Sequence, residues 1–460
     1  MNNLTNQTKI SRRDFLKIAG GAAALLVGAN FLPQFLRKTL LPEKVVNAAG
    51  DPDLFFAGTD GWMYLPGDMP PYQPDPYAPT GLTTYIFGFR NLTGLDPAVD
   101  SQLIASQKNK AQHNAPLFWL DQFDDAAPKD FNLLLTNLGL AQRPDLTDSH
   151  TLHWHGFRNV IPYFDGEPTG SISVPVNRFF TYVYRPRDPG TYMYHCHVED
   201  VEHVHMGMTG IVFVRALQNK YGVGGGSVAP VARANGGGAG APLGYVYNDG
   251  LAVSDPLSTA YDREFPMFLS EVWTAAHWND AHIQDTDWST YKADYSLLNG
   301  RVYPDTLAPS GGGRDLSTGD LIAPTGRPEL QYNPHSALVE CNAGEKVLLR
   351  FANLGFREAA MTFAGLTVKV VGRDATPMKG RDGTDTSYET DTLLMGAGES
   401  YDVIFTAPPK TGAGYDTYLL YNRRYTQEDG QNINGGQRTE IRVYAAGTLT
   451  PQDPNDGYGI

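Results

Sequence analysis

Short runs of apolar residues, or of alternating apolar and polar residues, recur along most of the chain. In the first half they cover residues 83–89, 116–120, 131–135, 179–184 and 210–214, and in the second half 265–269, 346–353, 366–371, 401–405, 418–421 and 439–444. Each run has the length of a strand, clusters of turn-forming residues separate the runs, and no long amphipathic helix pattern occurs between them. The pattern therefore predicts an all-β protein.

A segment rich in Gly, Ala and Pro divides these strand patterns into two groups. It covers residues 218–244 and has few bulky apolar side chains, which is typical of a linker or a long loop. A chain of 460 residues is too long for one ordinary core and long enough for two domains. We therefore predict one β-domain over 50–217, a second over 245–447 and a tail over 448–460.

The N-terminus carries an export pattern. The motif SRRDFLK at residues 11–17 is followed by an apolar run that ends at Phe31 and by a candidate cleavage site at 47–49. This is the pattern of a twin-arginine signal, and its apolar run is too short to span a bilayer comfortably. We predict that residues 1–49 direct export to the periplasm or the exterior, with no stable membrane span after removal. Basic residues between 37 and 44 leave an uncleaved anchor as the alternative.

Composition narrows the possible functions. The formal net charge of -14 argues against a nucleic-acid surface, because phosphate binding requires clustered Lys and Arg. Exported proteins often contain disulfides, but Cys196 and Cys341 are the only 2 cysteines, so no disulfide framework is expected. Cys341 lies in an apolar strand pattern and is predicted to be a small buried residue.

Most of the 11 histidines lie in two short clusters. The stretch HTLHWHG contains His150, His153 and His155, and the stretch from 190 to 214 contains His195, Cys196, His197, His203, His205, Met206 and Met208. Alternation along a strand would place both histidines of HWH on one face. It would likewise place both histidines of HCH on one face and the Cys196 thiol on the opposite face.

These clusters predict copper as the cofactor, at two sites. Two histidines, one cysteine and a weak methionine ligand describe a blue-copper electron-transfer site, whereas zinc sites rarely use methionine. Two HxH pairs on neighbouring strands would offer four imidazoles to a separate metal cluster. A c-type haem is not expected, because the chain has no CxxCH motif.

Residues 115–215 resemble the first cupredoxin domain of the multicopper oxidases, the family of the laccase-like proteins. The resemblance rests on HWHG, FDGEP at 164–168, GTYMYHCH and GMTGIVFV. The second half is similar to the middle, copper-free cupredoxin domain of that family, through LLNGRVYPDT at 297–306, VECNAGEKVLLRFAN and LLMGAGESYDVIF at 393–405. The resemblance implies two cupredoxin-like Greek-key β-sandwich or barrel domains, of which only the first binds copper.

The sequence departs from the family pattern at the type 1 copper. In the family this copper lies in the last domain, in patterns that resemble HxxHxHG and HCHxxxHxxxxM, whereas here both patterns fall in the first domain. The resemblance then implies a type 1 copper held by His150, Cys196, His203 and Met208. His205 and Met206 are the alternatives to the last two ligands, because residues are inserted after the HCH motif.

The same resemblance implies roles for the other histidines. His153 would be a ligand of a type 2 copper, and the type 3 coppers would be bound by His155, His195 and His197. Asp165 matches a carboxylate that, in the family, lies near the type 2 copper and assists proton delivery. Because it precedes Gly166, Asp165 could equally be an ordinary turn residue.

The histidine count leaves three interpretations open. A family-type trinuclear cluster takes eight histidines from two domains, yet the corresponding second-half stretch 359–374 has none, and the remaining candidates are scattered, namely His113, His277, His282 and His335. The favoured interpretation is an oxidase that reduces O2 and whose other ligands come from another subunit or are unorthodox. The second is a nitrite-reductase-like trimer with a catalytic copper at a subunit boundary, bound by His153, His195 and one second-domain histidine such as His335 or His282. The third is a type 1 electron carrier.

The sequence leaves the reaction partners partly open. We expect the electron donor to be a reducing small molecule, a metal ion or a redox protein, and the favoured acceptor to be O2. A homo-oligomer such as a trimer is also expected, and nucleic acid is not expected as a partner.

Overall fold

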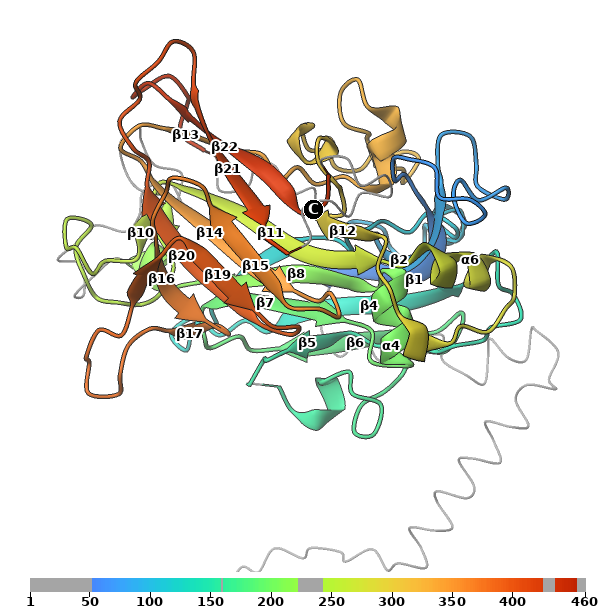
Figure 1. The fold of residues 1–460 in the computed structure, drawn as a ribbon. Helices are drawn as coiled ribbons and strands as arrows, with labels where there is room; N and C mark the ends of the chain where they lie inside the picture. Colours follow the sequence, from blue (N-terminus) through green and yellow to red (C-terminus); the bar gives the residue numbers. More distant parts are fainter. Residues whose placement is uncertain (1–51, 159, 222–242, 425–434, 453–460) are drawn as a thin grey trace, which may run out of the picture. The chain divides into compact units, whose positions relative to one another are not determined.

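The computed structural model describes residues 52–158, 160–221, 243–424 and 435–452 (Figure 1). The predicted signal segment, most of the predicted linker and most of the predicted tail lie outside the described residues. The described residues from 52 onward belong to one compact unit. Among the residues that the structure describes, no helix combines the length and the apolar character needed to cross a bilayer.

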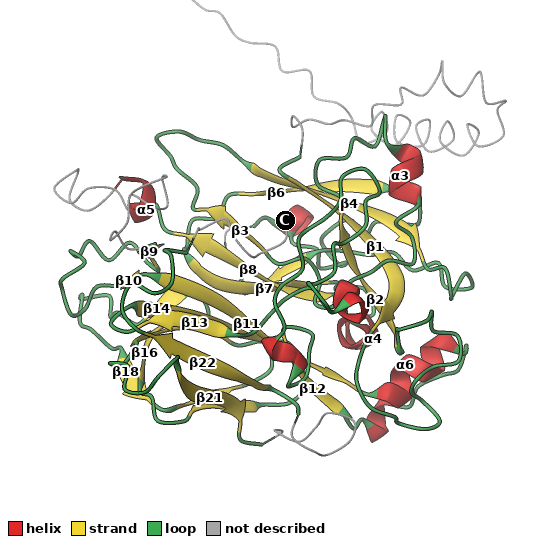
Figure 2. Ribbon diagram, turned by 90° about the horizontal axis from the view of Figure 1, so that it is seen from above, coloured by secondary structure: helices red, strands yellow, loops and turns green. Residues whose placement is uncertain are grey.

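The first half of this unit contains two four-stranded sheets (Figure 2). Its elements are β1 (Leu54–Met63), β2 (Thr84–Asn91), α3 (Ser101–Ala105), β3 (Phe118–Asp121), β4 (Phe131–Gly139), β5 (His153–His155), η1 (Pro162–Phe164), β6 (Phe179–Tyr184), β7 (Gly190–His195), α4 (Asp200–Met206), β8 (Thr209–Arg215) and α5 (Gln218–Tyr221). One sheet has the order β2-β1-β4-β6 and the other β3-β8-β7-β5. The predicted strand over 179–184 is therefore confirmed with its bounds as β6.

The core of the first half is aromatic. Phe118 lies at its centre, with its ring centroid 5.5 Å from that of Phe56 and 5.6 Å from that of Trp154. These residues come from β1, β3 and β5, so the two sheets share one apolar core. The core also contains Cys196 and Met208, which places the predicted thiolate site inside the packed part of the domain.

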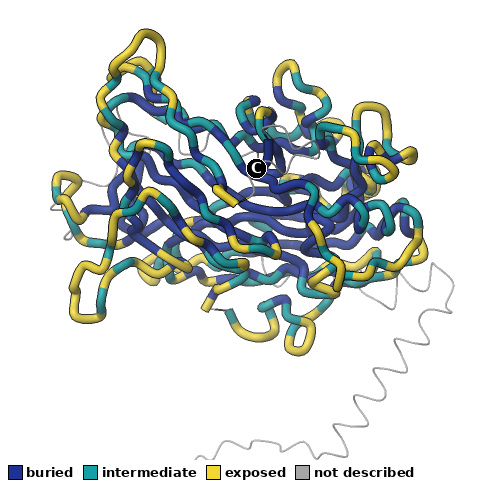
Figure 3. Tube along the Cα trace, in the orientation of Figure 1, coloured by how far each residue is buried: buried dark blue, intermediate teal, exposed yellow. Residues whose placement is uncertain are grey.

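The second half is also built of strands. Its elements are β9 (Gly244–Tyr245), β10 (Ala260–Tyr261), β11 (Arg263–Val272), α6 (Thr274–Ala281), η2 (Trp288–Thr290), β12 (Tyr295–Leu298), η3 (Asp305–Leu307), η4 (Pro328–Tyr332), β13 (Val339–Asn342), β14 (Lys346–Asn353), β15 (Ala359–Phe363), β16 (Val368–Arg373), β17 (Thr376–Pro377), β18 (Tyr388–Thr390), β19 (Thr392–Met395), β20 (Ser400–Thr406), β21 (Asp416–Asn422) and β22 (Arg438–Tyr444). A seven-stranded sheet runs β12-β11-β14-β20-β16-β17 with β18 beside β16, and a five-stranded sheet runs β13-β22-β21-β15-β19. The all-β prediction is confirmed, and the strands of both halves are largely buried (Figure 3).

Apolar and ionic contacts fix the two halves against each other. Met193 of β7 and Phe213 of β8 belong to one apolar cluster with Phe268 of β11. Beside this cluster the hydroxyl of Thr191 in β7 donates to Asp402 of β20 at 2.6 Å, and Asp402 also pairs with the buried Arg350 at 3.1 Å. A buried charge without a partner would be strongly destabilising, so this network requires the halves to stay in register. It thereby holds β7, the strand that leads into Cys196.

Candidate metal centres

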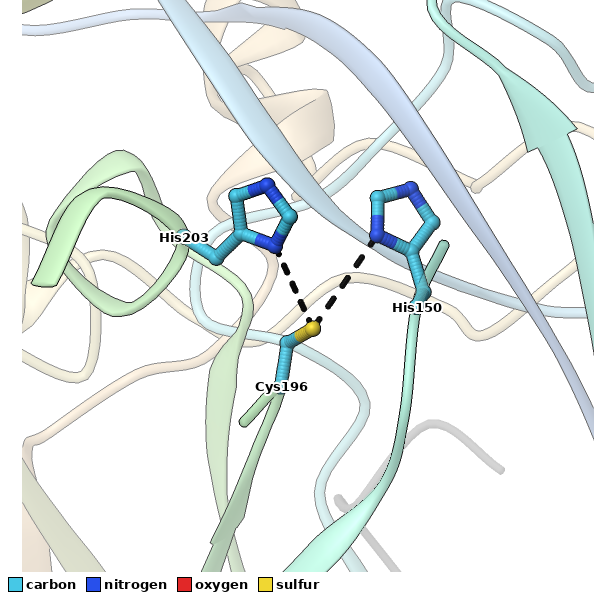
Figure 4. A group of neighbouring side chains, drawn as sticks. All are labelled: His150, Cys196 and His203. Atoms are coloured by element: carbon cyan, nitrogen blue, oxygen red, sulfur yellow. Dashed lines mark hydrogen bonds between the residues drawn. The ribbon is translucent and has the colours of Figure 1, made fainter. Parts of the chain in front are cut away.

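Cys196 lies directly after β7 and is surrounded by two imidazoles (Figure 4). Its Sγ is 3.2 Å from Nδ1 of His203 and 4.0 Å from Nδ1 of His150. All three side chains are fully buried. A thiolate and two imidazole nitrogens around one point form the donor set of a blue-copper site.

Backbone hydrogen bonds position these three ligands. His150 exchanges two of them with Val174, at 3.0 and 2.8 Å, just before β5 begins. The backbone N–H of Cys196 donates to the carbonyl of Met208 at 3.1 Å, and the N–H of Thr151 donates to the Cys196 sulfur at 3.4 Å. His203 lies on helix α4, between the Cys196 turn and β8. Three segments of the first half therefore converge on one sulfur atom.

The Met208 side chain lies next to His150 at the buried site. A methyl group added to Gly58 of β1 would come within 2.5 Å of Cδ2 of His150 and within 3.2 Å of Cε of Met208. The imidazole and the thioether methyl therefore both lie against the backbone of Gly58, where only a glycine leaves them room. Met206 is also fully buried, so burial alone does not distinguish the two methionines.

The electrostatics of this site favour the thiolate. Burial by itself raises the pKa of the Cys196 thiol, but the adjacent His203 and His150 hold it well below its usual range. For His203 burial acts in the other direction and lowers the pKa, because the charged form of histidine is the protonated one. The Cys196 thiolate and the Asp148 carboxylate outweigh burial and raise the His203 pKa to about 10. Oδ2 of Asp148 lies 3.8 Å from Nε2 of His203. Because the thiolate is the form of cysteine that binds metal, the protein already stabilises the ligand form.

Four of the five other histidines in the two clusters gather on the opposite side of Cys196. Strands β5 and β7 are antiparallel with His153 opposite His195, as the two HxH motifs predict. The ring of His153 is 5.2 Å from that of His195 and 5.1 Å from that of His197. Ligand-capable nitrogens of His153, His155 and His195 all lie within 4.8 Å of one another.

Carbonyl groups orient two of these rings. Nδ1 of His153 donates to the carbonyl of Asp165 at 2.7 Å, and Nδ1 of His195 donates to the carbonyl of Cys196 at 2.8 Å. A carbonyl can only accept, so Nδ1 carries the proton in both rings and Nε2 is left for a metal. Burial lowers the pKa of His195 to about 3 and also lowers the pKa of His153. Both imidazoles are therefore neutral near pH 7, as a metal ligand must be.

Asp165 is both a turn residue and a neighbour of this site. It ends the short helix η1, and a side chain on Gly166 would collide with the carbonyl of Leu152. Its Oδ1 lies 3.4 Å from Nδ1 of His153. The two interpretations of Asp165 are therefore compatible, because the turn is what brings the carboxylate to the histidine.

His205 belongs to neither group, contrary to its inclusion among the candidate ligands. Its Nε2 accepts the backbone N–H of Trp273 at 3.1 Å, and its ring lies 5.1 Å from that of His277 and 5.3 Å from that of Tyr291. The reason is helical geometry, since residues two apart on a helix point in different directions. When His203 faces Cys196, His205 on the same helix α4 faces the second half.

The remaining four histidines lie away from both sites. His113 shares a hydrogen bond with Oγ of Ser270, and Nδ1 of His277 donates to the carbonyl of Tyr85. His335 is buried near Arg301. Burial, with a smaller effect of the Arg301 charge, lowers the pKa of His335 to about 3. His282 is stacked between the rings of Tyr77 and Trp278, with Nε2 facing Asp75. Neither His335 nor His282 reaches His153 or His195 within the chain.

Three groups that contact the ligands of the buried site could not be recognised from the sequence. They are Asp148 beside His203, Gly58 beneath His150 and the Thr151 amide that donates to Cys196. Cys341, in contrast, is a free and fully buried residue in the core of the second half, as predicted, and burial raises its pKa to about 12.

Comparisons with known proteins agree with this architecture. One multicopper oxidase family model matches residues 137–219, a second matches 266–447, and a twin-arginine signal model matches 9–29. Laccase-3 of Botryotinia fuckeliana is 22% identical over 311 residues, which are 67% of this chain and 52% of that protein. The chain thus spans about half the length of this relative. The predicted twin-arginine export is confirmed.

Solved structures with the same fold include two oxidases. The blue copper oxidase from Nitrosomonas europaea has a TM-score of 0.53 at 18% identity, with 85% of each chain covered. The multicopper oxidase mgLAC has a TM-score of 0.52 at 19% identity, with 87% of this chain and 88% of that chain covered. These likenesses support the two cupredoxin-like domains. The two oxidase family models together match more than half of the 460 residues, and the chain therefore belongs to the multicopper oxidase family, whose cofactor is copper.

Proposed function

We propose that the protein is a copper-dependent oxidase that takes single electrons from a reductant and reduces O2. Type 1 copper would be held in the buried site by His150, Cys196, His203 and Met208. The copper that meets O2 would be held by His153, His155, His195 and His197. When bound, copper supplies one-electron redox chemistry at the first site and an oxygen-binding centre at the second.

The observation that carries this proposal is the position of Cys196 between His195 and His197. Its side chain belongs to the buried site, whereas the two neighbouring side chains belong to the four-histidine site. The hydrogen bond from His195 to the Cys196 carbonyl, 2.8 Å long, adds a second connection to the covalent backbone. Electrons that enter at Cys196 would therefore need to cross only one residue to reach the other site.

The donor atoms fit copper at both sites. The thiol of Cys196 is held in its ionised form, and His150 and His203 both direct Nδ1 at its sulfur. His153 and His195 are held neutral with Nε2 available. Thiolate and neutral imidazole are the forms in which these residues bind copper, so copper would displace the proton that His203 carries in the copper-free protein.

Asp165 is the candidate proton carrier of the second site. Reduction of O2 to water consumes protons, and the carboxylate of Asp165 is 31% exposed while it lies 3.4 Å from the His153 ring. It can therefore exchange protons with solvent and deliver them beside His153.

The nitrite-reductase-like alternative has less support. It requires His335 or His282 beside His153 and His195, but His335 is buried beside Arg301 and His282 is stacked between the rings of Tyr77 and Trp278. The electron donor would be a reducing small molecule, a metal ion or a redox protein, and the proposal does not depend on which.

A spectroscopic comparison with one variant tests the proposal. Copper-loaded protein should show type 1 optical and paramagnetic signals together with signals of further copper, and should consume O2 with a one-electron reductant. Cys196→Ser should remove the type 1 signals and reduce turnover by more than about 100-fold while copper at the four-histidine site remains. Survival of the blue colour in this variant would refute the type 1 assignment.

A further inference from the structure

The second half of the chain supplies no proposed copper ligand, yet it contacts the four-histidine site. The turn between β19 and β20 contains Gly398, and a methyl group added there would come within 3.0 Å of Nε2 and 3.3 Å of Cε1 of His155. The His155 ring therefore lies directly against the backbone of this turn. Carbonyl groups of the first half orient the rings of His153 and His195, whereas the ring of His155 rests on a wall that belongs to the second half.

Hydrogen bonds fix this turn against strand β7. Ser400, the first residue of β20, donates its hydroxyl to the carbonyl of Thr191 at 2.7 Å, and the hydroxyl of Thr191 donates to Asp402 at 2.6 Å. Thr191 lies two residues before Met193, which is the residue of β7 that pairs with His155 of β5. The turn and the histidine are therefore attached to the same strand, and their separation is fixed.

A second close approach between the halves occurs where β7 begins. Gly190 has a φ of 136°, and a methyl group added there would come within 2.7 Å of Cα of Ala375 in the second half. The neighbouring Asp374 acts on the histidine site, because burial and the nearby His153 lower the pKa of His155 while the Asp374 carboxylate raises it. The second half thus reaches His155 both with its backbone and with a charge.

We propose that Gly398 is a positioning residue of the four-histidine site and that the second half sets the position of the His155 ring through it, an inference that rests on the proposed oxidase function. A methyl group 3.0 Å from the ring would force the ring to move by a few tenths of an ångström. Side chains of a functional site work within about 0.5 Å of their productive positions, so such a displacement uses much of the tolerance. Glycine alone leaves the ring in place.

The chain contains a matched turn at Gly344. Both turns have the sequence Ala-Gly-Glu and lead directly into a strand, which is β14 after Gly344 and β20 after Gly398. In both, the glutamate N–H donates to the carbonyl three residues earlier, at 3.1 and 3.3 Å, and the glycine φ is 86° and 81°. Apart from its chain neighbours, a methyl group on Gly344 would meet no heavy atom of the described residues within 4 Å. The two glycines therefore share a backbone conformation and differ in the contact with His155.

Alanine at these two glycines, in copper-loaded protein, tests the proposal. Gly398→Ala should weaken copper binding at the four-histidine site by about 10- to 100-fold and reduce the paramagnetic signal of that copper, while the type 1 absorption persists. Gly344→Ala should retain copper and signals at both sites, although the positive φ lowers its stability to urea. Competition with a copper chelator measures the affinities. A copper affinity of Gly398→Ala equal to that of Gly344→Ala would overturn the proposal.

Replacement of His155 tests whether the effect passes through this ring. With His155 present, Gly398→Ala should lower the urea midpoint of the copper-free protein more than Gly344→Ala does. In a His155→Ala background there is no ring to displace, so the two glycine substitutions should lower the midpoint equally. This background also gives the answer if Gly398→Ala alone fails to fold. The same extra loss in both backgrounds would show that Gly398 does not act on His155.

The two proposals fail in different ways. Loaded wild-type protein without copper beyond the type 1 ion would reject the oxidase proposal, and the positioning role with it. Wild-type copper affinity at the four-histidine site of Gly398→Ala would reject only the positioning role.

Discussion

The two candidate copper sites lie on opposite sides of the same residue and differ in almost every physical property. The site around Cys196 is fully buried, combines sulfur with nitrogen ligands and is built from three segments of the first half. The four-histidine site consists of imidazoles alone and is partly exposed, with two of its rings fixed by backbone carbonyls. A site that only transfers electrons can be closed by its own domain, whereas a site that binds O2 must remain reachable.

This difference also explains why the residues of the proposed type 1 site all come from one chain, whereas the four-histidine site is open on one side. The buried ligands are fixed by the packing of the core, where Phe87 of β2 lies against His203 at 5.8 Å between ring centroids. Two of the partly exposed histidines, His153 and His155, lie on β5, a strand of only 3 residues at the edge of its sheet. An edge strand leaves one side available to a partner.

The largest expected effect separates the sites by function. His153→Ala should reduce O2 consumption by more than about 100-fold, since it removes a ring at the centre of the four-histidine site, and should preserve the type 1 absorption. Stopped-flow reduction of the type 1 site, followed without O2, provides the readout for that site. If His153→Ala also removed the type 1 absorption, the two sites would not be separable as described.

The second prediction concerns helix α4. His203→Ala should abolish the type 1 signals, whereas His205→Phe should keep them, because only His203 faces the Cys196 sulfur. The His205 change should instead lower the free energy of unfolding by about 1–3 kcal/mol, through loss of the hydrogen bond from Trp273. Optical spectra and denaturant unfolding of both variants check this. The opposite pattern of spectra would assign the ligand to His205.

A smaller effect is expected at Gly58, whose backbone lies against His150 and Met208 of the buried site. Gly58→Ala would bring a methyl group within 2.5 Å of the His150 ring and should shift the type 1 absorption and weaken copper binding at that site by about 10-fold. Gly396→Ala is the matched control, since its methyl group would make only ordinary contacts with Glu399. Identical spectra for Gly58→Ala and wild type would show that the site does not depend on this close approach.

The smallest effect concerns the copper-free protein. Its His203 has a pKa of about 10, above the value of about 6.5 expected when unfolded, so protonated His203 contributes stability below pH about 6.5 that is lost as pH rises through about 10. Asp148→Asn lowers the His203 pKa and should move this loss to lower pH, with a difference of about 1 kcal/mol near pH 8. Urea unfolding of the chelated protein between about pH 6 and 10 measures it. Asp382→Asn, which removes an exposed carboxylate, should follow the wild-type profile, and so would Asp148→Asn if Asp148 did not act on His203.

Periodicity in the sequence was sufficient for much of the fold. The strands β6 and β14 match the predicted runs to the residue, because their apolar positions follow the pleat. Strand β1 was missed, although all 10 of its residues are buried. Its Asp60 is buried yet accepts hydrogen bonds from Tyr85 and from the backbone of Ala141 and Gln142, so a polar residue occupies a core position that local patterning excludes.

The sequence by itself determined the all-β class and the export signal. It also separated two candidate metal sites, because alternation along a strand turns Cys196 away from its two neighbours. Only the tertiary structure placed His203 rather than His205 beside Cys196 and Asp148 beside His203. It also showed that five histidines lie outside both candidate sites. Those outcomes depend on how a helix is rotated against two sheets and on which buried groups find partners. Such contacts join residues far apart in the chain, and no local pattern records them.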